Sequence, residues 1–232
     1  GSTATAPWVD AEMALDAQPG IAVLNFGPYA DTASDPTYAG AKCLTFDRNL
    51  ESVRSVFQVW RLPQDSGAQF LGSSSAPANT DGGTGTHLNA YRYDFHRGYG
   101  SGTSVCERGS ILSGWDANSG NAAQAARGGV ILQNGAKLAN TWQYQPKYEE
   151  WVVIESHTLA GCHASGIACD RDSMKRGGLA LAELIVYERE LTEREKISTR
   201  NYLMKKWLGK TDEELQPVPE PDPAQELRYE QI

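Results

Sequence analysis

The sequence predicts an all-β protein that ends in one α-helix. Eight short segments are rich in branched and aromatic residues and are separated by polar turns, which is the pattern of antiparallel strands. Twenty-three glycines and eleven prolines supply tight turns between them. With 232 residues and 40% hydrophobic content, the chain is long enough to form one large β-domain with its own core.

We expect the chain to enter the domain at residues 8–15 and then to form the strands. Their predicted ranges are 21–26, 42–46, 53–62, 68–72, 87–95, 129–138, 151–158 and 179–187. The loops 73–85, 98–106 and 116–128 are rich in Gly, Ser, Asn and Thr. Loops of this kind commonly carry function on a rigid scaffold.

The clearest local signal is a tight turn inside the segment 129–138. The apolar runs VILQ and AKL are separated by Asn134 and Gly135. A two-residue hairpin turn needs positive φ at both central residues, which Asn and Gly tolerate best. We therefore expect a β-hairpin with its turn at these two residues.

The last predicted strand and the helix lie directly next to each other in the chain. Residues 179–187 are apolar except for Glu183, as expected of a strand that is covered on both faces. A buried carboxylate needs a partner. We interpret Glu183 as structural and expect an arginine or backbone donors to bind it.

The helix is predicted by its cap and its apolar stripe. Thr192 and Glu195 have the T-x-x-E spacing of a capping box, in which each side chain bonds a free backbone N–H of the other residue. The stripe behind the cap consists of Ile197, Met204 and Leu208, with Leu203 and Trp207 alongside. The helix is therefore expected to pack on a sheet.

The composition changes after residue 209. Pro217, Pro219, Pro221 and Pro223 alternate with apolar and acidic residues, which is typical of a stiff, extended linker. We therefore predict a domain of residues 1–209 and an acidic, proline-rich linker or tail of residues 210–232. A linker of this kind suggests a longer parent protein with further modules.

The end of the predicted domain resembles the closing signature of a known family. The run AELIVYER at 182–189, followed by Leu191-Thr192, Glu195, Tyr202-Leu203 and Lys206-Trp207, is similar to the end of bacterial laminin-G-like domains of the concanavalin A-like lectin/glucanase superfamily. Earlier stretches that fit the same order are WVDA at 8–11, VRSVF at 53–57, FLG at 70–72 and DFHRG at 94–98. The chain departs from the family pattern at Glu188, where the family has Asp, and at Leu181, where it has Ile.

The resemblance covers residues 8–207 and implies a fold and a broad role. The implied fold is a two-sheet antiparallel jelly-roll sandwich of the concanavalin A-like kind. Family members are usually non-catalytic modules of secreted or surface proteins. The superfamily hosts many functions, so the step from fold to sugar binding is an analogy.

The net charge of −8 is concentrated in the tail. Residues 210–232 hold seven acidic and two basic residues, whereas the remaining body holds 22 acidic and 19 basic residues. Nucleic-acid binding needs a basic excess and attachment to anionic lipid needs lysine clusters, so we expect neither partner. The chain has no run of about 18 apolar residues, and we expect no membrane insertion.

Four cysteines occur without a C-x-x-C pair, which argues against structural zinc and thioredoxin-like chemistry. Cys162 and Cys169 flank the short polar sequence HASGIA, so we favour a disulfide between them across a loop or hairpin, with Cys43–Cys106 as the second pair. Four cysteines allow three connectivities. Buried free thiols are the alternative, above all for Cys43 in the apolar run 42–46.

Aromatic and hydrogen-bonding side chains that suit a sugar gather around residues 87–99. In a strand, Tyr91 and Tyr93 share one face, while Arg92, Asp94 and His96 share the other. Rings stack on the apolar face of a pyranose, and charged or amide groups bond its hydroxyls. The predicted site consists of Tyr91, Arg92, Tyr93, Asp94, His96, Arg97, Tyr99, Trp115, Asp116, Asn118 and Trp142.

Each of these residues also has a structural interpretation. The rings of Tyr91 and Tyr93 could pack between two sheets, and His96 and Arg97 recur in the family resemblance for reasons of fold. Loop tryptophans such as Trp115 often mark a binding surface, but they also fold back over sheet edges. We assign the other tryptophans, Trp8, Trp60, Trp151 and Trp207, to the core.

We expect no cofactor. Asp81, Asp116 and Asn118 could supply oxygen ligands to calcium, but no D-x-D-x-D-G loop is present. Calcium binding is therefore only weakly supported.

We also expect no catalysis. The paired carboxylates of jelly-roll glycosidases lie on an E-x-D-x-E strand, which this chain lacks. Glu155 and His157 share a strand face, but a second acid is missing there, and no G-x-S-x-G elbow presents a serine.

The leading hypothesis is a non-catalytic carbohydrate-binding or adhesion module of a larger secreted or cell-surface protein. Its partners would be a glycan or neighbouring modules of the same chain. Gly1-Ser2 looks like a cloning scar, so we expect that a signal peptide has been removed. The alternatives are a structural spacer or protein-interaction domain, and then a glycoside hydrolase or lyase with an unfamiliar site.

Overall fold

The computed structural model describes residues 23–30, 34, 36–37, 39–62, 71–72, 129–138, 149–169 and 176–220, and the backbone of 8–10, 68–69 and 96–97. Over these residues the protein is mostly β, with antiparallel strand pairs and one α-helix. This confirms the predicted all-β class with a C-terminal helix.

The main sheet has the strand order β1-β2-β10-β3-β9-β7-β8, and β5 pairs with one end of β9. Its strands are β1 Trp8–Asp10, β2 Val23–Asn25, β10 Ala180–Tyr187, β3 Leu44–Arg61, β9 Val152–Ile167, β7 Val130–Gln133, β8 Ala136–Lys137 and β5 Leu71–Gly72. A separate pair joins β4 Ala68–Gln69 to β6 His96–Arg97. The predicted strand at 87–95 lies outside the described residues.

Two strands are much longer than the sequence predicts. The predicted strands 42–46 and 53–62 form the single strand β3, which spans 18 residues. The predicted strand 151–158 continues to Ile167 as β9, so residues 163–167 of HASGIA are strand and not a loop. Between the two predicted strands, polar residues such as Asp47 and Arg48 lie on an exposed part of the sheet.

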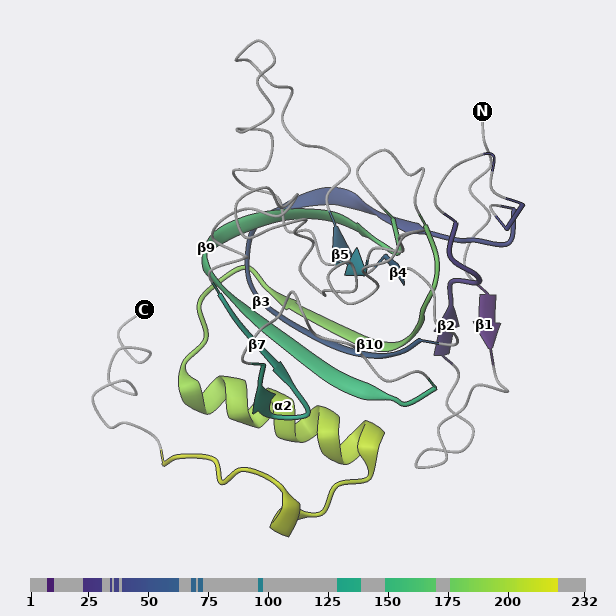
Figure 1. Ribbon diagram of the computed structural model, residues 1–232. Coiled ribbons are helices and arrows are strands. Elements are labelled where there is room, and N and C mark those ends of the chain that lie inside the picture. The colour runs from purple at the N-terminus through teal and green to yellow at the C-terminus, as the bar shows by residue number, and fades with distance from the viewer. Residues whose placement is uncertain are drawn as a thin grey trace, which may run out of the picture.

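The sheet folds back over itself because β3 and β9 bend. Their pairing shifts register between Thr45 and Leu50, between Leu50 and Val53, and between Val53 and Ser55. Bulges of this kind bend a strand and increase its twist. As a result β3 and β9 run through an upper and a lower layer, with β5 between them in the view (Figure 1).

The core lies in two places on opposite faces of the same strands. The inner cluster lies between the layers and includes Val56, Trp60 and Ile154. The outer cluster lies between the lower layer and the helix and includes Phe57 and Val59. Neighbours on β3 therefore point alternately to the two clusters, as the period of a strand requires.

The helix α2, Glu193–Leu208, packs across the outer face of the lower layer (Figure 1). Both halves of the predicted capping box form, since Thr192 accepts from the Glu195 N–H and Glu195 accepts from the Thr192 N–H. Gly209 ends the helix with φ of 64°, in the left-handed region that favours glycine. Trp207 is buried against the sheet, as predicted.

The predicted hairpin is confirmed. Asn134 and Gly135 connect β7 to β8 with φ of 49° and 82°. The Asn134 side chain also accepts a 2.8 Å hydrogen bond from the Val153 N–H, which ties the turn to β9. The other predicted core tryptophans differ: Trp60 is fully buried, Trp151 is half-buried, and the Trp8 side chain lies outside the described residues.

The chain does not leave the protein at residue 209, where we divided domain from tail. The division itself stays a prediction. Residues 210–220 lie along α2, and within them the short 3-10 helix η2, Asp212–Glu214, turns the chain back. Leu215 packs against the outer cluster. Within the predicted tail, Leu215 is therefore in contact with the core.

Candidate functional site

Most of the predicted sugar-binding residues lie outside the described residues. These are Tyr91, Arg92, Tyr93, Asp94, Tyr99, Trp115, Asp116, Asn118 and Trp142. His96 and Arg97 form β6, whose backbone pairs with Gln69 and Ala68 of β4. The sugar site therefore stays a prediction, and β6 places two of its members on a short strand.

The same holds for calcium. Asp81, Asp116 and Asn118 all lie outside the described residues. Among the residues that the structure does describe, no group of three or more His, Cys, Asp or Glu side chains could hold a metal ion. The described part of the chain thus offers no alternative metal centre.

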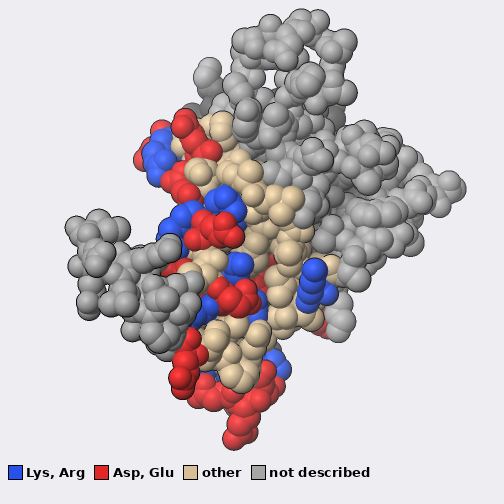
Figure 2. Space-filling view, turned by 90° about the vertical axis from the view of Figure 1, so that its left-hand side faces the viewer, with Lys and Arg blue, Asp and Glu red and all other residues tan. Residues whose placement is uncertain are grey.

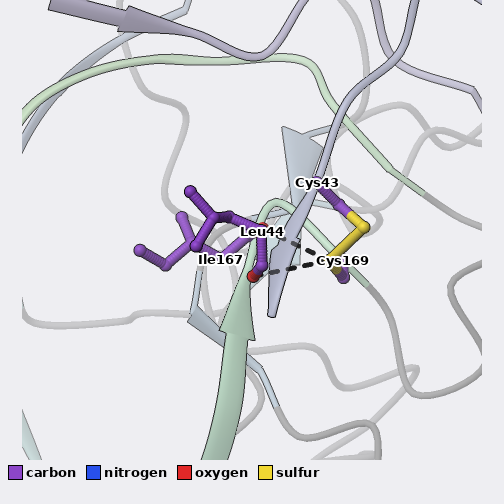
Figure 3. Close-up of a disulfide and its surroundings, with 4 residues drawn as sticks. All are labelled: Cys43, Leu44, Ile167 and Cys169. Atoms are coloured by element: carbon purple, nitrogen blue, oxygen red, sulfur yellow. Dashed lines mark hydrogen bonds between the residues drawn. A yellow bond between two sulfur atoms is a disulfide. The ribbon is translucent and has the colours of Figure 1, made fainter. Parts of the chain in front are cut away.

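The disulfide joins different cysteines from those predicted. Cys43 is bonded to Cys169, with 5.2 Å between their Cα atoms (Figure 3). Both predicted pairings, Cys162–Cys169 and Cys43–Cys106, are therefore wrong. Because residues 162–167 continue β9 as extended chain, Cys162 and Cys169 are roughly 20 Å apart, whereas a disulfide needs Cα atoms within about 7 Å.

Figure 3 shows the disulfide at the start of β3 and beyond the end of β9. The Cys169 Sγ lies 3.3 Å from the carbonyl oxygen of Ile167 and 3.8 Å from that of Leu44. Cys162 is a buried free thiol, and burial raises its pKa to about 11. It therefore stays protonated and is a poor nucleophile.

The most concentrated set of polar side chains in the described structure lies between the sheet and α2. Strand register places Ser55 of β3 opposite His157 of β9, and Phe57 opposite Glu155. All four side chains point to the helix face, since the alternate residues Val56 and Ile154 belong to the inner cluster. Ser55, Glu155 and His157 thus come from two adjacent strands.

Their hydrogen bonds form a chain. The Ser55 Oγ lies 2.9 Å from the Nδ1 of His157, and the His157 Nε2 lies 3.4 Å from the Oε2 of Glu155. The edge of the Phe57 ring meets the imidazole with 5.6 Å between ring centroids. Serine, histidine and carboxylate are therefore connected in that order.

The helix closes this chain with a cation. The Arg200 Nε donates to the other carboxylate oxygen of Glu155 in a buried ion pair. Only 4% of the Arg200 side chain and 1% of the Glu155 side chain are exposed. A second nitrogen of Arg200 donates a 2.7 Å hydrogen bond to the Gln216 side chain. We call Ser55, Glu155, His157, Arg200 and Gln216 the buried polar network.

The composition of the network is that of a nucleophile, a base and an acid, but its position does not suit catalysis. A catalytic serine must reach a substrate, and Ser55 is 2% exposed in the middle of a strand. The carboxylate that would orient the histidine is already paired with Arg200. What the network can do is bind helix to sheet, because its members come from β3, β9, α2 and the segment after α2.

A second carboxylate also connects sheet and helix. Glu183 of β10 accepts hydrogen bonds from Lys206 at 2.9 Å, from Tyr202 at 3.1 Å and from the Trp207 indole. Partial burial by itself would raise the pKa of Glu183, but these three donors outweigh it and lower that pKa. The expected structural role has its partners, although they are a lysine and two aromatic side chains and not an arginine.

The described surface also carries charged side chains of both signs. Ion pairs connect Arg48 to Glu188 at 2.9 Å, Arg54 to Glu190 at 3.0 Å and Arg189 to Glu195 at 2.6 Å. Figure 2 shows blue and red side chains interspersed over the described part of this face, with acidic side chains gathered at its lower end. This face therefore has no continuous positive patch.

Sequence reasoning missed Ser55, Arg200 and Gln216. A signal for Arg200 was present, since Ile197, Arg200, Met204 and Trp207 follow one another at intervals of three and four residues. An arginine on an apolar stripe predicts a buried cation with a carboxylate partner. Gln216 carries no comparable signal, because nothing in a proline-rich segment indicates which residue turns back to the helix.

None of the protein-family models, curated proteins or solved structures that were compared with this chain matches it. The resemblance to laminin-G-like domains therefore rests on the motifs alone and stays a prediction. Within the described residues, no helix has both the length and the apolar character needed to cross a membrane.

Proposed function

We propose that this chain is a non-catalytic carbohydrate-binding or adhesion module of a larger secreted or cell-surface protein. We further propose that it is a two-sheet jelly roll of the concanavalin A-like kind. The observation that carries the proposal is the folded-over antiparallel sheet, in which β3 and β9 pass through both layers and a disulfide joins their ends.

The disulfide supports the proposed location. Disulfides form and persist in oxidising compartments and are rare in the cytosol. Cys43 and Cys169 are 126 residues apart in sequence, and their bond closes the fold as a whole. Such a bond is typical of secreted and surface domains.

The proposed mechanism is weak binding by stacking and hydrogen bonding. The predicted residues around Tyr93 and Trp115 supply rings, while Arg92, Asp94 and Asn118 supply groups for hydroxyls. Linkage to further modules would raise a low individual affinity through effective concentration.

A glycan array with this protein, read with and without calcium, tests the proposal. We expect binding that falls at least about tenfold in Trp115→Ala and Tyr93→Ala, which corresponds to about 1.4 kcal/mol. Tyr202→Ala is the matched control, because Tyr202 is an exposed tyrosine on α2 outside the predicted site. Absence of binding to every glycan by the folded protein would contradict the proposal.

A structural spacer or protein-interaction domain is the second candidate. It is favoured by the way the described surface pairs its own charges, such as Arg48 with Glu188 and Arg54 with Glu190. Quenching of tryptophan fluorescence separates the two candidates. Strong quenching that is lost in Trp115→Ala indicates an exposed loop ring and favours sugar binding, whereas weak quenching favours the spacer.

A glycoside hydrolase or lyase is the third and weakest candidate. It would need two carboxylates about 5–10 Å apart in a cleft. The nearest set in the described structure is the buried polar network, and its only carboxylate, Glu155, is 1% exposed and paired with Arg200.

A further inference from the structure

Residues 211–220, which we call the strap, run back along α2 after the helix has ended. Gly209 reverses the chain in the left-handed conformation, and the Lys210 N–H donates to the carbonyl of Met204. Figure 1 shows the strap in yellow, passing below α2 from its C-terminal end towards its N-terminal end. The strap is therefore antiparallel to the helix.

The start of the strap has a cap of its own. The Thr211 N–H donates a 3.0 Å hydrogen bond to the Glu214 carboxylate. The same carboxylate forms an ion pair with Lys210 at 2.6 Å. Lys205 of α2 forms an ion pair with Asp212. The turn after Gly209 is thus held by bonds within the turn and by an ion pair to the end of α2.

Three residues, Leu215, Gln216 and Pro219, then fasten the strap to the outer cluster and the helix. Leu215 packs against the outer cluster. The Gln216 carbonyl accepts a 2.8 Å hydrogen bond from the Asn201 side chain, and the Pro219 carbonyl accepts a 2.8 Å hydrogen bond from Arg194. From residue 201 to residue 194 the helix rises roughly 10 Å, which three to four extended residues span.

Gln216 is the contact that involves a buried charge. Its side chain accepts from Arg200, which is 4% exposed and already bonds Glu155. A guanidinium has five N–H donors and must have them satisfied when it is buried. Without Gln216, this buried cation would lose one of its acceptors, so release of the strap is opposed by more than a surface contact.

We propose that the strap is a latch that fixes the end of the described chain, residue 220, at one position beside α2. Gln216 binds the strap to Arg200, and Arg194 holds its far end, so residue 220 is kept near the N-terminal end of α2 and away from its C-terminal end. Pro217 and Pro219 restrict the backbone between these two points and stiffen it. This inference does not depend on sugar binding.

Backbone amide relaxation by NMR tests the latch in the full chain. In the wild-type protein we expect order parameters of about 0.85 for the Val218 and Glu220 amides, the value of a rigid backbone. In Arg194→Ala, the order parameter of the Glu220 amide should fall below about 0.6, while the Gln216 amide should stay rigid. Gln216→Ala should lower both Val218 and Glu220 below about 0.6, the range of a flexible segment.

Glu213→Ala is the control, since Glu213 is an exposed residue of the same strap, and it should change none of these amides. The Thr192 amide in the helix cap reports that α2 stays folded in every variant. Order parameters below about 0.6 at Val218 and Glu220 in the wild-type protein would overturn the latch. So would a Gln216→Ala variant whose strap is as rigid as that of the wild type.

Discussion

The two faces of the lower layer are built from the same strands but closed by different means. On the inner face, Val56, Trp60 and Ile154 meet the other layer of the folded-over sheet in a cluster of apolar side chains. On the outer face, Phe57 and Val59 meet α2 beside a network of charged and polar side chains.

The two faces are also held closed by different kinds of bond. The inner face is closed when β3 and β9 bend back, and a covalent bond between Cys43 and Cys169 holds the ends of that bend. The outer face is closed by an added helix, and the Glu155–Arg200 pair holds it. Apolar contacts are non-directional, so the charged pair is suited to selecting one position of the helix on the sheet.

The buried polar network and Gln58 differ in how completely their polar groups are paired. On the outer face each member of the buried polar network has a hydrogen-bond partner. On the inner face Gln58 is 2% exposed, and its side-chain nitrogen has no acceptor in the described structure. The outer face therefore gains specificity from its polar residues, whereas Gln58 costs stability.

Removing the disulfide should destabilise the protein more than any other change considered. Cys43→Ala with Cys169→Ala should lower the free energy of unfolding by about 2–5 kcal/mol, and the 126-residue separation places it towards the upper end. Urea unfolding followed by tryptophan fluorescence measures it. Cys162→Ala is the control, because it removes a buried thiol and leaves the disulfide intact. A double variant no less stable than that control would show that the bend needs no lock.

Breaking the buried ion pair between Glu155 and Arg200 should have the next largest effect on stability. Arg200→Met should cost about 3–5 kcal/mol, because the buried Glu155 carboxylate would lose its counter-charge. The same urea titration measures the loss.

Replacing both partners sharpens this result. Glu155→Leu with Arg200→Leu should recover much of the stability that Arg200→Met loses, since apolar residues of similar size often replace a buried ion pair at little cost, although His157 and Gln216 each lose one partner. The helix should dock less uniquely in this variant, which broadened amide signals from α2 would reveal. A double variant as unstable as Arg200→Met would mean that the pair itself stabilises the protein.

Replacing one polar residue on each face should change the free energy of unfolding by a smaller amount and in opposite directions. Gln58→Leu should raise the free energy of unfolding by about 1 kcal/mol, because it removes a buried donor that has no acceptor. Ser55→Ala should lower it by about 1 kcal/mol, because it deprives His157 of its 2.9 Å partner. Equal signs for the two changes would refute the contrast between the faces.

The smallest effect concerns the cap that starts α2. Hydrogen bonds from Arg189, and then from Thr192, lower the pKa of Glu195 from 4.5 to about 2. Its contribution to stability is therefore complete above about pH 4.5 and declines as the pH falls towards about 2. Glu195→Gln should lose about 0.5–1 kcal/mol at pH 7 and flatten the acid limb of thermal unfolding between those values. An unchanged acid limb would show that the cap does not couple to pH.

Much of the local structure was predictable because it depends on residues close together in the chain. The turn at Asn134-Gly135 needs only two residues that tolerate positive φ. The cap of α2 needs only Thr192 and Glu195, three residues apart. The apolar strand β10 and the single charge at Glu183 were likewise visible in the sequence, although the partners of Glu183 were not.

The candidate site was less predictable. The shared face of Glu155 and His157 followed from the period of a strand, but their connection to Ser55 requires the register of β3 against β9. Bulges set that register, and they depend on how two long strands bend together.

An antiparallel β-protein with a hairpin, a buried last strand and a capped helix could be predicted from the sequence, since short-range bonds and strand periodicity decide these features. Three features needed the folded protein: the pairing of Cys43 with Cys169, the fusion of two predicted strands into β3, and the network of Glu155, Arg200 and Gln216. These residues are far apart in the chain, and only the bend of the sheet and the packing of the helix bring them together.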